Sequence, residues 1–343
     1  MQVIRKPLLE VEDLHTHFLL DEGTVRAVNG ATFALHAGET LGVVGESGCG
    51  KSVMARSILR IVPTPGRIVE GRILFHRMAG HLSEAIDLTA LDPRGDLMRS
   101  IRGLEISMVF QEPMSSLSPV HTIGDQIVEA VQLHQDITEA QAYRQAIAML
   151  DDVGMPEPQR TADRYPHELS GGMCQRAMIA MALCTHPDLL IADEPTTALD
   201  VTTEAQILQL MGQLQHRYGM AILFITHNLG VIAQMTERVV VMYLGRVVED
   251  AKVDDLFHRP LHPYTRALLA SIPRLGQSIG ARPKPQRKRL ASIRGQVPNA
   301  YSIPNGCPFH PRCIAVRPGL CDAAEPPWRA VETEHWVRCV LYG

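Results

Sequence analysis

The chain contains, at residues 45–52, the octet Gly45-Glu46-Ser47-Gly48-Cys49-Gly50-Lys51-Ser52, which matches the pattern G-x-x-x-x-G-K-[ST] at every specified position. The apolar run Thr40–Val44 before it is typical of a buried parallel strand, and residues 52–61 are typical of a helix. The octet therefore lies at a strand-to-helix turn, where backbone N–H groups at a helix N-terminus form an anion site. A chance glycine-rich turn is the alternative, and both flanks argue against it.

The chemistry of this octet indicates a nucleoside triphosphate with Mg²⁺. Lys51 can reach β- and γ-phosphate oxygens, and the Ser52 hydroxyl can ligate the metal ion. The residues of the loop that we expect to bind the nucleotide are Gly45, Ser47, Gly48, Cys49, Gly50, Lys51 and Ser52.

Polar residues follow three further apolar runs. Gln111 follows residues 106–110, the pair Asp193-Glu194 follows residues 189–192, and His227 ends residues 222–227. An open α/β sheet binds its ligands beyond the carboxyl ends of its strands, so we expect these side chains to converge on phosphates bound at Lys51.

Two more segments, Leu169-Ser170-Gly171-Gly172-Met173 and Ala198-Leu199-Asp200, complete a pattern that runs from about Leu8 to the C-terminus. In this order and at these separations, the chain resembles the ATP-binding subunit of an ABC transporter. The resemblance implies an α/β phosphate-loop NTPase core with an antiparallel β subdomain and a helical subdomain.

The resemblance also implies a role for each polar residue. Gln111 would contact Mg²⁺ or the attacking water, Asp193 would be the second Mg²⁺ anchor, and Glu194 would be the general base. His227 would hydrogen-bond the γ-phosphate, and Asp200 would lie at a dimer interface.

The segment at Ser170 carries Met173 where the family usually has Gln. By the resemblance, Ser170 and the amides of Gly171 and Gly172 begin a helix that completes the ATP site of the opposite subunit. The alternative is a helix cap by Ser170 without any ligand.

Residues 111–119, residues 262–269 and the cysteine-bearing tail resemble the oligopeptide and dipeptide importer branch, in particular its D-type ATPase. This implies peptide import with a second ATPase subunit, two transmembrane permeases and an extracytoplasmic peptide-binding protein as partners. Importers of nickel, glutathione and some sugars share this ATPase type and remain alternatives. A non-transport ABC ATPase and a regulatory module with dead sites are weaker, because the chain has no second cassette and keeps both Glu194 and His227.

Composition limits the other functions. The 343 residues carry a formal net charge of −4, which gives no electrostatic case for nucleic acid. No apolar run approaches the roughly 20 residues that span a bilayer, and the first residues lack the apolar segment of a signal peptide. We expect a peripheral protein at the cytoplasmic face of the membrane, attached through its permeases.

Composition shifts divide the chain into residues 1–275, a nucleotide-binding domain with a helical subdomain at about 112–187, a linker at 276–300 and a cysteine-rich module at 301–343. The pairs Asn29-Gly30 and Ala37-Gly38, with Asp21-Glu22-Gly23, predict turns in the antiparallel β layer.

Four of the seven cysteines, Cys307, Cys313, Cys321 and Cys339, lie in the last module with the spacing C-x5-C-x7-C-x17-C. Disulfides are disfavoured in the cytosol, and four thiolates suit an iron–sulfur cluster or tetrahedral zinc. The resemblance to the peptide branch favours a [4Fe–4S] cluster on which the tail depends for folding, with Zn²⁺ and unligated or paired cysteines as alternatives.

Overall fold

The computed structural model describes residues 7–79, 82–197, 199–272 and 293–343. In this part of the chain the central sheet has the order β11-β12-β10-β9-β3-β8-β7-β6. Its strands are β3 (Thr40–Val44), β6 (Ile106–Val109), β7 (Leu189–Asp193), β8 (Ala221–Ile225), β9 (Arg238–Tyr243), β10 (Arg246–Lys252), β11 (Arg329–Glu332) and β12 (His335–Val337). The strands from β9 through β3 to β6 pair in parallel, and β3, β6, β7 and β8 are buried along their whole length. Burial on both faces explains why these strands are continuous apolar runs.

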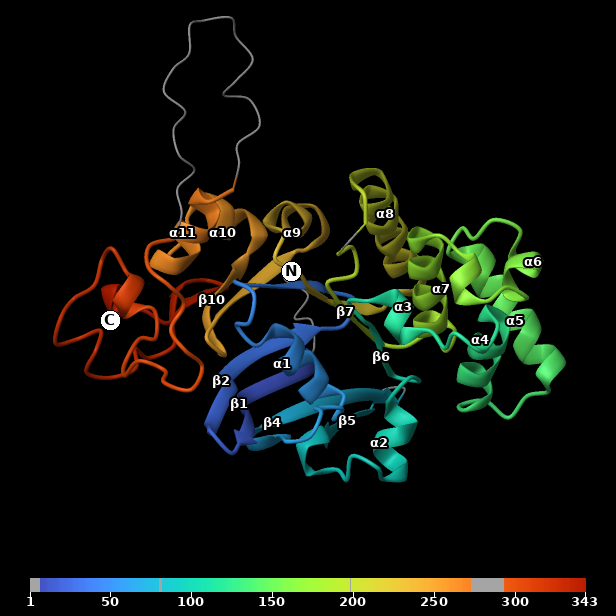
Figure 1. Cartoon of the computed structure of the whole chain (residues 1–343). Coiled ribbons are helices and arrows are strands. Elements are labelled where there is room, and N and C mark those ends of the chain that lie inside the picture. Colours follow the sequence, from blue (N-terminus) through green and yellow to red (C-terminus); the bar gives the residue numbers. More distant parts are fainter. Residues whose placement is uncertain (1–6, 80–81, 198, 273–292) are drawn as a thin grey trace, which may run out of the picture.

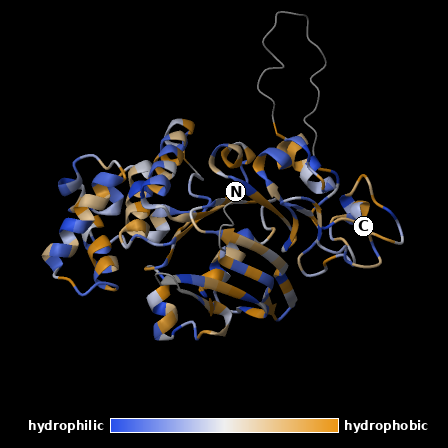
Figure 2. Ribbon diagram, turned by 180° about the vertical axis from the view of Figure 1, so that it is seen from behind, coloured by the Kyte–Doolittle hydropathy of each residue, from blue (hydrophilic) through white to orange (hydrophobic). Residues whose placement is uncertain are grey.

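A second, antiparallel sheet packs below the first in Figure 1 and has the order β2-β1-β4-β5. Its strands are β1 (Pro7–Leu20), β2 (Gly23–His36), β4 (Gly66–Ala79) and β5 (Leu82–Asp87). Hydrophilic and hydrophobic residues alternate along these strands, as Figure 2 shows, because one face is buried and the other is solvated. The antiparallel layer is therefore present as the sequence predicts.

The turn predicted at Asn29-Gly30 is wrong. Both residues lie inside β2, where Leu14 pairs with Ala31 and His15 pairs with Asn29, so that Gly30 has no partner in the register. Gly30 has φ +93°, and its position is a bulge that bends the strand without reversing it.

The helices fall into two groups. One group covers the sheets: α1 (Lys51–Ile58), α2 (Asp96–Ile101), α8 (Val201–Tyr218), α9 (Leu229–Met235), α10 (Val253–His258) and α11 (Pro263–Ala270). The other gathers at the right end of Figure 1: α3 (Pro113–Ser116), α4 (Ile123–Gln132), α5 (Glu139–Asp152), α6 (Pro158–Ala162) and α7 (Gly171–Leu183). Among the described residues, no helix combines the length and apolar character needed to cross a bilayer.

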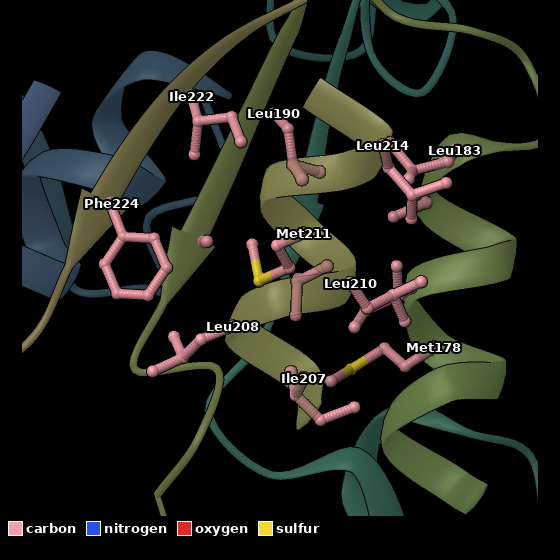
Figure 3. Packing of buried hydrophobic residues seen from close by; sticks show 14 of the residues in the cluster. Met178, Leu183, Leu190, Ile207, Leu208, Leu210, Met211, Leu214, Ile222 and Phe224 are labelled. Carbon is pink, nitrogen blue, oxygen red and sulfur yellow. The ribbon is translucent and has the colours of Figure 1, made fainter. Parts of the chain in front are cut away.

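The core beneath the site lies between the central sheet and the helices α7 and α8 (Figure 3). Leu190 of β7 and Phe224 of β8 point toward Met211 of α8, and Met178 of α7 packs on the other side of that helix. All four side chains are almost fully buried. Close packing of this kind fixes where β7 and β8 end, and both ends carry predicted site residues.

The C-terminal residues extend the central sheet. Strand β12 pairs with β10 in antiparallel register, and the His335 imidazole lies 2.9 Å from the carboxylate of Glu249. That carboxylate also accepts the backbone N–H groups of Leu261 and His262 at 2.7 and 2.8 Å. Phe309 packs into the large core cluster of the ATPase body. The expectation of a separate cysteine-rich module is thus not supported, because strand pairing and apolar packing join this region to the core.

The buried His262 predicts that the stability of the folded chain depends on pH. It is fully buried, burial lowers its pKa to about 4, and its Nδ1 accepts the backbone N–H of Tyr264 at the start of α11. The unfolded chain binds a proton at His262 more tightly than the folded chain does. The contribution of the neutral His262 to stability is therefore fully present above pH 6.5 and is lost as the pH drops toward 4. At 1.36 kcal/mol per pKa unit the loss approaches about 3 kcal/mol.

The matched variant is His262→Asn, because Asn caps a helix well and does not titrate. We expect urea unfolding at pH 7 and pH 4.5 to show a smaller acid loss in the variant than in the unmodified chain. An identical acid loss in both proteins would mean that His262 does not carry this dependence.

Candidate functional site

The loop between β3 and α1 depends on glycine at two positions. Gly50 has φ +102°, and a Cβ there would lie 2.1 Å from the Ala27 carbonyl oxygen. A Cβ at Gly45 would lie 2.3 Å from the carbonyl oxygen of Met242. Backbone atoms cannot yield to such contacts, so only glycine allows the loop to close against β2 and β9.

Lys51 lies at the end of this loop with its side chain folded over it. Its ammonium group donates to the carbonyl oxygens of Gly45 at 2.9 Å and Glu46 at 3.2 Å. The ammonium is therefore held at the mouth of the loop, where a phosphate group bound by the loop amides would meet it.

An open pocket of about 470 Å³ lies over the loop. It is lined by the predicted residues Ser47, Gly48, Cys49, Gly50, Lys51, Ser52, Gln111, Glu194 and His227, and also by Ala27, Val53 and Thr197. The loop, the end of β6, the end of β7 and the end of β8 thus meet at one place, as the sheet topology predicts.

Three side chains of the pocket hold the Glu194 carboxylate. Its carboxylate accepts hydrogen bonds from Thr197 Oγ1 at 2.9 Å and Gln111 Nε2 at 3.3 Å, and it lies 3.1 Å from His227 Nδ1. Burial raises the pKa of Glu194, but the hydrogen bonds from His227 and Thr197 outweigh it, so the pKa lies below its ordinary value. The carboxylate is therefore ionised at neutral pH. The backbone of Glu194 has φ +49°, a conformation that is strained for a residue other than glycine.

Asp193 and Ser52 form the second polar pair. The Ser52 hydroxyl donates to Asp193 Oδ1 at 3.0 Å, and burial raises the pKa of the carboxyl. Hydroxyl and carboxylate oxygens are the hard ligands that Mg²⁺ takes, usually together with water and substrate phosphates. The two side chains fit a Mg²⁺ ion carried by a nucleotide, and Gln111 lines the same pocket as Ser52.

The remaining predicted residues lie away from this pocket. Ser170 caps α7 by accepting the Met173 N–H at 3.3 Å, and Gly171 and Gly172 form the first turn of that helix. Asp200 caps α8 by accepting the backbone N–H groups of Thr202 and Thr203, both at 3.0 Å. None of these residues lines the pocket over Lys51, so in one chain they do not complete its phosphate site.

The predicted iron–sulfur cluster is wrong, and so is zinc as its alternative. Within the described residues, which include Cys307, Cys313, Cys321 and Cys339, no group of three or more His, Cys, Asp or Glu side chains could hold a metal ion. The four cysteines line a cavity of only about 10 Å³, which is at most the room for one water. Burial raises the pKa of Cys307 to about 11, so its thiol stays protonated at neutral pH.

Sequence reasoning missed several residues around the site. Thr197 lies three residues after Glu194 on the same loop, and a hydroxyl so close to a predicted base was a usable signal. Arg312 and Tyr264 were missed as partners of Glu46, although they hydrogen-bond its carboxylate and its backbone N–H. These contacts join residues more than 200 positions apart, so no local spacing points to them.

Together the fold and the pocket define a phosphate-loop nucleotide hydrolase with a helical subdomain beside its central sheet. Residues 28–197 match the family described as ABC transporter, and residues 248–321 match the family described as oligopeptide/dipeptide transporter, C-terminal region. The chain belongs to the ABC transporter ATPases, in the branch that carries this C-terminal region.

Curated relatives match along nearly the whole chain. A putative peptide import ATP-binding protein of Brucella abortus is 49% identical over 98% of both chains. The dipeptide transport ATP-binding protein DppD of Bacillus subtilis is 45% identical over 97% of this chain and 94% of its own length. The oligopeptide transport protein OppD of Salmonella typhimurium is 46% identical over 93% of this chain and 89% of its own.

Solved structures match the ATPase core. The ATP-binding cassette MJ0796, in a dimeric post-hydrolysis state with ADP and phosphate, aligns with a TM-score of 0.61 at 27% identity, covering 71% of this chain and 98% of its own. CbiO1 from Clostridium perfringens aligns with a TM-score of 0.60 at 25% identity, covering 74% of this chain and 91% of its own. These likenesses support the fold of the ATPase core.

Proposed function

We propose that this chain is the ATP-hydrolysing subunit of an ABC importer for dipeptides or oligopeptides, and that it drives transport through partner permeases. The observation that carries the hydrolytic part is the ionised Glu194 carboxylate, held by Gln111, Thr197 and His227 at the pocket over Lys51. The peptide assignment is supported by the C-terminal region and by relatives that are peptide, dipeptide and oligopeptide transport proteins over nearly their full length.

In this proposal the loop amides and Lys51 bind the phosphates of ATP, and Ser52, Asp193 and Gln111 provide oxygen ligands for Mg²⁺. The bound metal ion would neutralise charge on the phosphate oxygens. Glu194 orients a water and takes its proton, while Gln111 and Thr197 hold the carboxylate toward the pocket. His227 fixes the other carboxylate oxygen and offers its ring to the γ-phosphate.

The site is proposed to be completed by a second ATPase subunit. At the helix start, Ser170 and Gly171 are exposed and Gly172 is half-buried, and none of them lines the pocket of its own chain. A helix N-terminus of this kind suits a phosphate carried by a partner, with Asp200 at the interface between the two subunits. The dimeric state of the similar cassette MJ0796 agrees with this arrangement.

The proposed assembly contains this chain, a second and different ATPase subunit, two permeases and an extracytoplasmic peptide-binding protein, with the ATPases at the cytoplasmic face. We keep the division into a nucleotide-binding domain over 1–275, with its helical subdomain at 112–187, a linker at 276–300 and a C-terminal part at 301–343. The linker falls mostly outside the described residues.

Reconstitution of the assembled complex in lipid vesicles tests the peptide assignment. We expect ATP-dependent uptake of a radiolabelled dipeptide or oligopeptide and faster ATP hydrolysis when the peptide and its binding protein are present. Uptake should be absent when this chain carries Glu194→Gln. Uptake of nickel or glutathione in place of peptide would contradict the assigned solute, and hydrolysis without any transported solute would contradict the transport function.

A further inference from the structure

Glu46, the second residue of the phosphate loop, contacts Lys51 and two side chains that do not line the pocket over Lys51. Its backbone N–H donates to the hydroxyl of Tyr264 at 2.8 Å, and its carboxylate accepts two hydrogen bonds from Arg312 at 2.7 and 3.0 Å. Its carbonyl oxygen accepts from Lys51 Nζ at 3.2 Å. One residue therefore links the phosphate-binding ammonium to two C-terminal side chains.

Arg312 reaches Glu46 through the interior of the protein. Its side chain is only 4% exposed, and its guanidinium lies 5.8 Å from the ring centre of Tyr243 and 5.9 Å from that of Phe309. Its Nε donates to the carbonyl oxygen of Arg294 at 3.0 Å. The paired Glu46 raises the pKa of Arg312, so the guanidinium stays charged, and a two-pronged contact between planar ions is strongly directional.

The segment that carries Arg312 is itself anchored to the ATPase body by contacts independent of the loop. Strand β12 pairs with β10, His335 contacts Glu249, and Arg246 of β10 forms an ion pair with Glu325. Arg312 is thus presented from a fixed position to a loop that must hold its shape for nucleotide to bind.

We infer that the C-terminal region positions the phosphate loop through Arg312, which neutralises and orients Glu46 and so maintains the affinity of the site for ATP. Arg312 is a positioning residue, because it touches Glu46 and lies outside the pocket. Without it, the Glu46 carboxylate is a half-buried, unpaired negative charge within the phosphate loop, and it would repel phosphate and distort the loop. This inference rests on the ATP-binding function proposed above and adds the C-terminal region to its site.

The test measures binding of a fluorescent N-methylanthraniloyl-ATP with Mg²⁺ to the full chain, and kcat and KM for ATP in the assembled complex. Arg312→Ala should weaken nucleotide binding and raise KM by about tenfold or more, with a smaller change in kcat. Arg312→Lys keeps the charge and loses the two-pronged geometry, so its affinity for the nucleotide should lie between that of the unmodified chain and that of Arg312→Ala.

A second substitution separates positioning from general loss of folding. In Arg312→Ala, adding Glu46→Gln removes the unpaired charge, and we expect the double variant to recover most of the lost affinity. The matched control is Arg77→Ala, which removes a two-pronged ion pair with Glu105 outside the phosphate loop and outside the C-terminal segment; its affinity should stay within about twofold of the original.

Three results would overturn the inference: unchanged affinity in Arg312→Ala, no recovery in the double variant, or an equal loss in Arg77→Ala. Because nucleotide binding is measured on the isolated chain, these results are independent of solute uptake. If these variants bind nucleotide as the inference expects but the complex takes up no peptide, only the proposed transport function is overturned.

Discussion

Glu194→Gln is expected to lower ATP turnover by about 10²- to 10⁴-fold, the range for a lost general base. Glutamine has the same shape, so it can still meet Gln111, Thr197 and His227, but its amide cannot take a proton from water. The pKa of Glu194 lies below its ordinary value, so the carboxylate is already ionised at neutral pH and its loss removes a working base.

Phosphate release in the assembled complex and nucleotide binding to the isolated chain are the two measurements. Affinity for ATP should stay within about twofold, since the substitution removes an interaction made in the transition state. Glu204→Gln is the matched control: Glu204 accepts a hydrogen bond from Thr196 at 2.9 Å on the adjoining loop and does not line the pocket. Normal turnover in Glu194→Gln would remove Glu194 from the proposed chemistry.

The parallel core was predictable because its strands are short, mostly apolar and end at polar residues. The predicted strand at residues 40–44 has the same bounds in the structure, and Gln111, Glu194 and His227 meet at one pocket because parallel strands end on one edge. The helix after the loop ends at Ile58, before the predicted residue 61, since Arg60 adopts φ +56° and cannot continue it.

The errors have a common physical cause: they concern distances between segments that local spacing does not encode. Asn29-Gly30 has the composition of a turn, yet pairing with β1 turns it into a bulge. The cysteine count matches a metal site, yet Cys307, Cys313, Cys321 and Cys339 enclose only about 10 Å³. Arg312 and Glu46 are 266 residues apart, and only the folded chain brings them together.

Gly171→Asp is expected to abolish hydrolysis in the assembled complex, with a loss of at least about 100-fold, although it lies outside the pocket of its own chain. Gly171 is exposed, and a Cβ there meets no atom within 4 Å, so the side chain fits without strain. An aspartate in the first turn of α7 favours the helix by about 0.3–1 kcal/mol, so the fold should not be weakened. The same carboxylate would repel the phosphate of a nucleotide bound by a partner.

The decisive comparison is therefore between stability, binding and turnover in one variant. Thermal unfolding should occur at the original temperature or slightly above it, ATP should bind the isolated chain as before, and only turnover in the assembled complex should be lost. Gly171→Ala adds the same Cβ without the charge and should lose less than about tenfold, because the helix N–H groups still face the partner. If Gly171→Asp weakens ATP binding to the isolated chain, the helix start acts on its own pocket and not on that of a second subunit.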